Sequence, residues 1–138
     1  MTLTEPEARA RLAAARVARL ATADEGGRPH VVPVTFDVRG DSIVIAVDHK
    51  PKRTPDLKRL RNIRANPRVS VLADHYEEDW TRLWWVRADG VAALLEDAAG
   101  RAEPVARLCG KYPQYRERPP EGPVIAIAID AVSGWSYA

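Results

Sequence analysis

The sequence predicts a mainly β protein, an antiparallel β-barrel with peripheral helices, and three observations support this prediction. Between residues 17 and 47 the chain offers short β-branched runs separated only by turns, which disfavours the helical crossovers of a parallel sheet. The longest strand-like run, residues 83–94, contains a glycine, as long bent barrel strands often do. Helix-like segments lie between the strands and can cover the rim. The length of 138 residues suits a single domain, residues 1–138.

A helix is predicted at the start of the chain, followed by three strands. Thr4 and Glu7 have capping-box spacing, and the following alanine-rich run favours a helix up to residue 15. Residues 17–22 and 31–38 are β-compatible and are separated by a strong turn signal, so they are expected to pair as a hairpin. Residues 43–47 follow another tight turn and complete a predicted antiparallel meander.

A second helix is predicted to begin at Thr54. This residue is a suitable N-cap, Pro55 is tolerated in a first turn, and Asp56 is an early acid. The helix should end at Ala65, because the next residue precedes a proline. Residues 68–73 then return the chain to the sheet.

The rest of the chain is predicted as strand, helix and strand. Residues 83–94 form the long strand, with a bulge or bend near Gly90. Residues 97–109 favour a helix that Pro104 should kink or delay. Residues 124–129 form a last strand with isoleucines on one face.

Composition limits the classes of partner. A net charge of +2 is too small to argue for nucleic acid by itself. No nucleic-acid partner is expected, and a nucleic-acid-binding role for the basic helix is the third-ranked alternative. No run approaches the roughly 20 apolar residues needed to cross a bilayer, and the first residues lack the order of a signal peptide. We therefore expect a cytoplasmic protein with no membrane partner.

No motif supplies a metal site or a catalytic group. His30, His49 and His75 are dispersed without ligand spacing, so no metal is predicted. Cys109 lies in an apolar stretch, where a buried thiol is the usual outcome. No phosphate loop, serine elbow or catalytic Cys/His signature is present. The catalytic residues stay unknown, and redox chemistry would have to come from a bound cofactor.

The segment that says most about function is the basic run before and within the second predicted helix. Cations gather at the helix N-terminus, where backbone N–H groups add positive potential suited to a phosphate. Lys58 and Arg61 are three residues apart and share a helix face. Asp56 argues against a phosphate site because its carboxylate competes for the same donors. An ordinary solvated basic helix is the alternative interpretation.

Tryptophans predict a homodimer. Trp84 and Trp85 should point to opposite faces of their strand, one into the core and the other into an interface. With Trp80 and Trp135 added, a chain this short would otherwise expose a large aromatic surface.

Three segments, in this order and spacing, resemble the pyridoxamine-phosphate-oxidase-like superfamily, specifically its actinobacterial branch that depends on coenzyme F420. They are RLAT at residues 19–22, GGRPHVVPV at residues 26–34 and RNIRANPRVSV at residues 61–71. The resemblance covers nearly the whole chain, including KYPQY at residues 111–115. It implies a six-stranded antiparallel split barrel of the FMN-binding type, and a homodimer that holds two cofactors at its interface.

By position, the resemblance also implies a set of cofactor-binding residues. One strand would place its backbone beside the tricyclic ring of the cofactor, and the basic segment would hold its phosphate. The strand residues are Pro29, His30, Val31, Val32, Pro33 and Val34; the residues of the basic segment are Lys50, Lys52, Arg53, Thr54, Lys58 and Arg61.

The end of the chain departs from true pyridoxamine-phosphate oxidases, because residues 134–138 lack their arginine-containing substrate motif. We therefore predict an F420-dependent oxidoreductase that transfers a hydride between reduced deazaflavin and an unidentified small organic acceptor. FMN is the alternative cofactor, although the anionic oligoglutamate tail of F420 suits the basic segment. A non-catalytic flavin- or deazaflavin-binding protein of the same fold is the alternative function.

Overall fold

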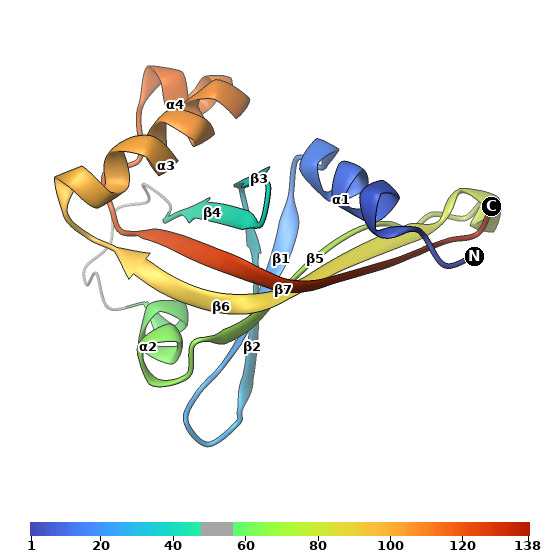
Figure 1. Cartoon of the computed structure of the whole chain (residues 1–138), viewed down its shortest axis with the longest axis horizontal. Helices are drawn as coiled ribbons and strands as arrows, with labels where there is room; N and C mark the ends of the chain where they lie inside the picture. Colours follow the sequence, from blue (N-terminus) through green and yellow to red (C-terminus); the bar gives the residue numbers. More distant parts are fainter. Residues whose placement is uncertain (48–56) are drawn as a thin grey trace.

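The computed structural model describes residues 1–47 and 57–138 and shows a curled sheet with helices on its outside (Figure 1). The elements, in chain order, are α1 (Glu5–Ala14), β1 (Ala18–Ala23), β2 (Pro29–Val34), β3 (Phe36–Arg39), β4 (Ser42–Ala46), α2 (Lys58–Ala65), β5 (Arg68–His75), the 3-10 helix η1 (Trp80–Arg82), β6 (Trp84–Leu95), α3 (Ala98–Lys111), α4 (Pro113–Glu117) and β7 (Val124–Ser136). Within the described residues, no helix is long and apolar enough to span a membrane.

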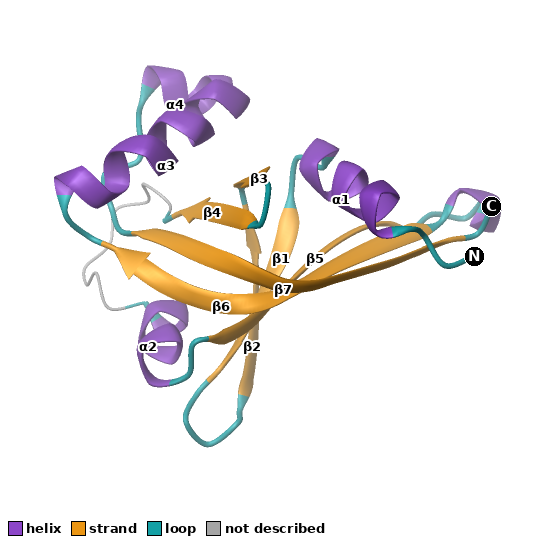
Figure 2. Cartoon of the chain, viewed as in Figure 1, coloured by secondary structure: helices purple, strands orange, loops and turns teal. Residues whose placement is uncertain are grey.

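The strands pair antiparallel in the order β2-β1-β5-β6-β7-β4-β3. The strands at the two ends of this order, β2 and β3, are separated in the chain only by Thr35. The chain therefore passes from one edge of the sheet to the other within one residue, and the sheet has to curl to allow this (Figure 2). This arrangement confirms the mainly β class with peripheral helices.

Two predictions about the strands are wrong for one shared reason. The predicted strand at residues 31–38 is divided at Thr35, because β2 pairs with β1 while β3 pairs with β4. The described residues therefore form seven strands instead of six. The predicted meander fails for the same reason, since β4 lies between β3 and β7 and not beside β2.

The main core fills the inside of the curled sheet. Leu20, Phe36, Ile43, Val71 and Ile127, from five different strands, are almost completely buried there. Two helices pack against this core and complete it. α1 contributes Ala8 and Leu12, and α2 contributes Leu60 and Ile63. A second, smaller cluster lies between α3 and the opposite face of β4, so that β4 is buried on both faces.

The helix boundaries agree in part with the predictions. The capping box is present: the Thr4 hydroxyl accepts from the Glu7 N–H, and the Glu7 carboxylate accepts from the Thr4 N–H. The second helix begins at Lys58, not at Thr54, because Leu57 is its extended N-cap. The residues proposed for the earlier start, Thr54, Pro55 and Asp56, lie outside the described residues.

Two further elements, α3 and β7, are longer than predicted. α3 runs through Pro104 without a delayed start, because Asp97 caps its first turn by accepting from the Gly100 N–H at 2.6 Å. The last strand continues past residue 129 to Ser136, where it still pairs with β6. The predicted irregularity at Gly90 is confirmed as a shift in register between β6 and β7.

Candidate functional site

The strand predicted to lie beside a cofactor, β2, is an edge strand. Within residues 1–47 and 57–138 it pairs only with β1, from Pro29 opposite Ala23 to Val34 opposite Ala18. An edge position suits Pro29 and Pro33, which cannot donate a backbone hydrogen bond. Its outward residues are exposed, and Val31 retains 60% of its accessible surface. The backbone of β2 is therefore open to a ligand on one side.

His30 lies on the inward side of β2, directly opposite Thr22 of β1. Its Nδ1 atom is buried and has no hydrogen-bond partner within the described part of the chain. Buried polar atoms are nearly always hydrogen-bonded, to protein groups or to ordered water, so this atom is an exception. The structure thus puts an unsatisfied polar atom in the strand that the sequence singled out.

Helix α2 is fixed beside the same end of β2 by a buried polar contact. The Asn62 side-chain amide donates to the Thr22 hydroxyl at 3.0 Å, and both residues are at most 4% exposed. The Asn66 amide also reaches the Asp24 carbonyl oxygen, at 3.5 Å. Because Thr22 faces His30, this contact places the helix next to the β1–β2 hairpin.

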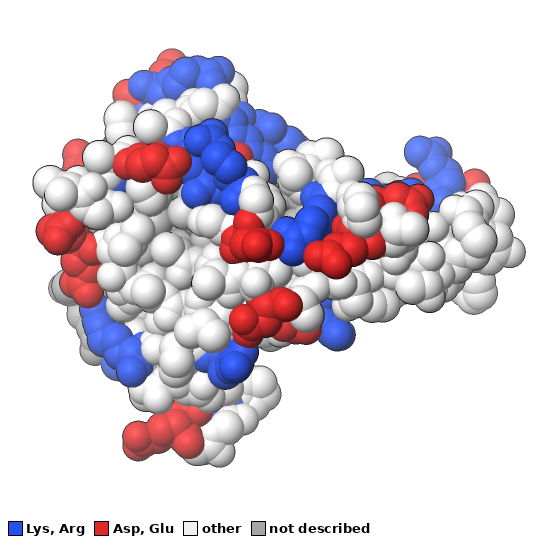
Figure 3. All heavy atoms as spheres, in the orientation of Figure 1, with Lys and Arg blue, Asp and Glu red and all other residues white. Residues whose placement is uncertain are grey.

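The N-terminus of α2 has the properties of an anion site. Leu57 makes no side-chain capping bond, and the first turn contains no acidic residue. Among the residues that the structure describes, no side chain therefore caps the first N–H groups of α2, which carry the positive end of the helix dipole. Lys58 opens the helix, and Arg61 follows three residues later at an exposed position. Basic side chains are visible over α2 at the lower left of Figure 3.

The carboxylate of Asp24 lies close enough to Lys58 for the two charges to interact. The pKa of Asp24 is lowered mainly by a backbone hydrogen bond from Arg28, with further contributions from the Gly26 N–H and the charge of Lys58. Asp24 is thus held by its own turn, through two backbone N–H groups at 2.9 Å. Its carboxylate is therefore occupied by its own turn and does not cap α2.

The predicted cofactor residues are only partly brought together. Pro29 and His30 lie at the hairpin end of β2, and α2, which carries Lys58 and Arg61, contacts the neighbouring strand β1 through Asn62 and Thr22. Val34 lies at the opposite end of the strand. The other residues of the basic segment, Lys50, Lys52, Arg53 and Thr54, lie outside the described residues.

Two open cavities flank β2. At the hairpin end, a groove of about 360 Å³ includes Pro29 and a Ser70–Asp89 hydrogen bond of 2.6 Å. At the Val34 end, a cavity of about 410 Å³ is lined by Arg16, Val17, Thr35, Tyr112, Gln114 and Tyr115. Within the described ranges, no group of three His, Cys, Asp or Glu side chains could hold a metal ion.

Sequence reasoning missed Thr22 and Asn62, which position α2, and the polar residues of the groove. One signal for Asn62 was available: it lies between Leu60 and Ile63 on the buried side of the helix, where a polar side chain needs a partner. The partner itself could not be identified, because it belongs to a strand 40 residues earlier in the chain.

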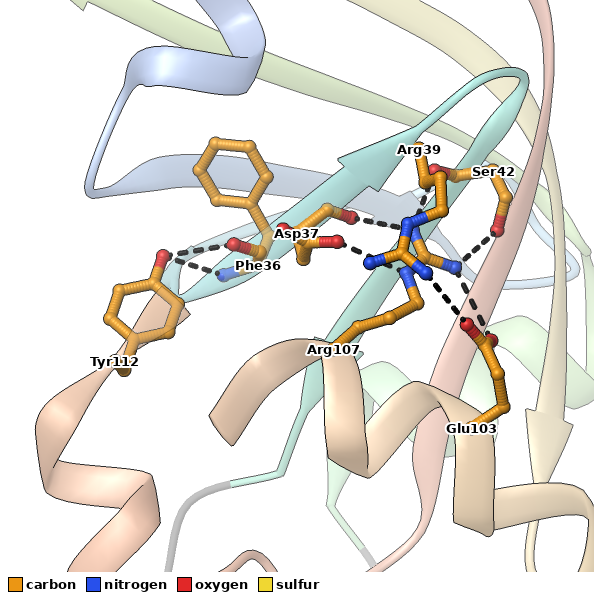
Figure 4. A network of polar contacts seen from close by, with 7 residues as sticks. All are labelled: Phe36, Asp37, Arg39, Ser42, Glu103, Arg107 and Tyr112. Carbon is orange, nitrogen blue, oxygen red and sulfur yellow. Dashed lines mark hydrogen bonds and ion pairs between the residues drawn. The ribbon is translucent and has the colours of Figure 1, made fainter. Parts of the chain in front are cut away.

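A second polar cluster joins α3 to the β3–β4 hairpin (Figure 4). The Arg107 side chain is only 5% exposed; its guanidinium contacts Asp37 Oδ2 at 3.0 Å, Ser42 Oγ at 3.1 Å and Glu103 Oε1 at 3.7 Å. The polar groups of this cluster hydrogen-bond or pair with one another, so the cluster fixes α3 against the β3–β4 hairpin and is not a candidate binding site.

Comparisons with solved structures identify the fold. The chain is similar to a FAD-binding protein from Mesorhizobium loti, with 28% identity over 97% of this chain and 95% of that one, and a TM-score of 0.76. A FAD-binding protein from Mycobacterium smegmatis has 19% identity over 96% and 93%, with a TM-score of 0.63. A heme storage protein from Vibrio cholerae has 19% identity over 96% and 93%, with a TM-score of 0.71.

Comparisons with sequences give a family. No curated protein matches this chain. The model of the family described as pyridoxamine 5'-phosphate oxidase matches residues 4–136, nearly the whole sequence. This match agrees with the curled antiparallel sheet and with the split-barrel resemblance of the sequence motifs. The chain belongs to the pyridoxamine 5'-phosphate oxidase family.

Proposed function

We propose that this protein is an oxidoreductase that binds a flavin-type cofactor along β2, with the cofactor phosphate at the N-terminus of α2. The observation that carries the proposal is the N-terminus itself. Its N-cap Leu57 makes no side-chain capping bond and its first turn holds no acid, it begins with Lys58, and the Asn62–Thr22 bond fixes the helix against β1, the strand that pairs with β2. Backbone N–H groups and a cation together bind a phosphate well.

The strand fits the other half of such a cofactor. A flat ring system with polar edges needs backbone donors and acceptors at its rim and a surface without bulky side chains. The edge strand β2 offers backbone groups with which no other described strand besides β1 pairs. The cofactor therefore has polar partners at both its phosphate and its ring.

When bound, a reduced flavin or deazaflavin supplies a hydride to an electron-poor acceptor. The chain's own residues position the reactants and stabilise developing negative charge. The 410 Å³ cavity at the Val34 end of β2 gives room for a small organic acceptor. We place the cofactor at the interface of a homodimer, because β2 exposes apolar side chains such as Val31 on its outer face.

We favour coenzyme F420 over FMN, because the basic residues from Lys50 onward suit an anionic oligoglutamate tail. The similarity to a FAD-binding protein at 28% identity supports a flavin-type cofactor in general. Titration of the purified protein with oxidised F420 and with FMN distinguishes the two. Tight FMN binding without F420 binding would make FMN the cofactor.

A non-catalytic binding protein is the second candidate. It is supported by the similarity to a heme storage protein, and no described residue has been assigned the role of catalytic acid or base. Turnover with the reduced cofactor and a range of enone, quinone and nitro acceptors separates the two functions. Saturable oxidation supports the enzyme, and binding without any turnover supports the carrier.

The phosphate site is tested by comparing two ends of one helix. Lys58→Ala should weaken cofactor binding roughly tenfold or more, because it removes a charge-assisted hydrogen bond to the phosphate. The loss should shrink at high salt. Arg64→Ala is the matched control: Arg64 lies in the last turn of α2, where its side chain forms an exposed ion pair with Glu96. Equal affinity in both variants and the wild type would place the phosphate elsewhere.

A further inference from the structure

The hydroxyl of Tyr112, at the C-terminal end of α3, holds the backbone where β3 begins. It accepts a hydrogen bond from the Phe36 N–H at 3.0 Å. It also lies 2.9 Å from the carbonyl oxygens of Phe36 and Arg16, to either of which it can donate. Figure 4 shows the phenol aimed at the Phe36 main chain. Tyr112 is 6% exposed, so water does not replace these bonds easily.

The neighbouring residue, Lys111, holds the same place from another side. Its ammonium group lies 3.9 Å from the centroid of the Phe36 ring and donates to the Ala15 carbonyl oxygen at 2.7 Å. Arg16 completes the connection by donating to the Lys111 carbonyl oxygen at 2.8 Å. The end of α3 is thus tied both to the start of β3 and to the segment between α1 and β1.

A third contact reaches the residue between the two strands. The Thr35 hydroxyl lies 2.6 Å from the hydroxyl of Tyr115 in α4. Thr35 is the single residue between the end of β2 and the start of β3. Contacts from Lys111, Tyr112 and Tyr115, where α3 meets α4, therefore hold the backbone corner formed by Thr35 and Phe36.

We propose that Lys111 and Tyr112 are positioning residues that fix the corner at Thr35 and thereby the backbone of β2. The inference rests on the proposed function, because it assigns β2 to the cofactor ring. Edge strand β2 has only β1 as a partner among the described strands, so its position depends on its two ends. The hairpin turn holds one end, and the corner at Thr35 holds the other.

A positioning role for Lys111 and Tyr112 predicts an effect on cofactor affinity that a purely stabilising role does not. A ring that binds to backbone groups requires them in place to within a fraction of an ångström, and small misplacements far from a reacting centre can weaken function greatly. Loosening the corner should therefore reduce cofactor affinity by more than an equal loss of stability elsewhere in α3 does.

The test compares Tyr112→Phe with Arg101→Met. Both remove hydrogen bonds to main-chain groups from α3: Arg101 donates to the Gly122 and Pro120 carbonyl oxygens at 2.9 and 2.6 Å, at the opposite end of the helix. Both variants should melt at a lower temperature. Only Tyr112→Phe should weaken FMN or F420 binding, by roughly tenfold, and change the visible absorption of the bound ring.

A second readout does not depend on the cofactor. Amide hydrogen exchange of the non-proline residues of β2 should speed up roughly tenfold in Tyr112→Phe, while β5 and β6 change no more than in Arg101→Met. If the wild type binds neither FMN nor F420, the proposed function fails and hydrogen exchange still tests the corner. Unchanged exchange in β2 would overturn the positioning role, and so would equal losses of affinity in both variants.

Discussion

Two arginines of the cluster in Figure 4 have very different surroundings, and this difference predicts their importance. Arg107 is buried between α3 and the β3–β4 hairpin and is paired with Asp37. Arg39 reaches Glu103 at 3.4 Å, but both side chains are more than 60% exposed. Burial decides which pair matters, because solvent screens the exposed one.

Arg107→Leu should lower the free energy of unfolding by about 3–5 kcal/mol, because it leaves the Asp37 carboxylate without its buried partner. Arg39→Leu should lower it by less than about 1 kcal/mol. Urea unfolding of both variants measures the difference. Similar losses for the two arginines would mean that the buried pair does not hold α3 in place.

Lys111 predicts how stability depends on pH. Partial burial is the main cause that lowers its pKa from the ordinary 10.5 to about 8, opposed by Asp37 and assisted by Arg16. Above pH 8 the folded chain gives up this proton while the unfolded chain keeps it. The free energy of unfolding should therefore rise with pH above about 8 and stay level below it.

The rise should stay under about 1.4 kcal/mol per pH unit, the limit for one proton, because the half-buried amine is partly screened by solvent. Measurement should stop near pH 9.5, since burial also raises the pKa of Tyr112, which acts in the opposite direction at higher pH. Lys111→Met should remove the rise. An identical pH profile in this variant would assign the effect to another group.

At the scale of elements, two glycines distinguish close strand packing from open helix surface. A Cβ on Gly90 would lie 2.3 Å from the Ala128 carbonyl oxygen, where the register of β6 and β7 shifts. A Cβ on Gly110, inside α3, would meet nothing within 4 Å. The first glycine is required by close approach of two backbones, and the second is not.

Gly90→Ala should therefore destabilise the fold by roughly 1–3 kcal/mol or more, because the β6–β7 pairing must open. Gly110→Ala should stabilise α3 by roughly 0.5–1 kcal/mol, because alanine loses less entropy in a helix. Thermal melting should show a lower melting temperature for Gly90→Ala and a higher one for Gly110→Ala. A neutral Gly90→Ala would show that the bulge absorbs a methyl group without strain.

Local elements could be predicted from the sequence, and pairings between distant segments could not. The capping box of α1 depends on residues three apart, so Thr4 and Glu7 indicate it directly. The division of one strand at Thr35 arises because β1 pairs with its first half and β4 pairs with its second half. No residue within 31–38 predicts these partners. The register of β1 and β2 likewise decides that His30 faces Thr22.

The candidate site follows the same rule. The cations of α2 and the prolines of β2 are visible in the sequence, and the structure puts Lys58 and Pro29 near the same hairpin. The Asn62–Thr22 bond that joins their elements depends on tertiary packing. The start of α2 at Lys58 also differs from the local capping signal at Thr54.

At the scale of the whole molecule, the aromatic residues divide between core and surface. Trp84 packs against the main core, and Trp85 lies on the outer face beside Arg87, as strand alternation predicts. Two aromatic residues beside the paired ends of β6 and β7 are exposed: Trp80 in η1, just before β6, is 69% exposed, and Tyr137, just after β7, is 52% exposed. Exposed aromatics of this kind are typical of a protein interface, and a homodimer would cover them.

The measurement that tests the central claim most directly is sedimentation velocity with absorbance recorded at the visible band of added F420 or FMN. We expect the cofactor to sediment with a protein species of twice the 15.3 kDa chain mass, at one cofactor per chain. This result would support the flavin-type site and the dimer together. Cofactor that stays behind with the free small molecules, while the protein sediments at 15.3 kDa, would contradict both.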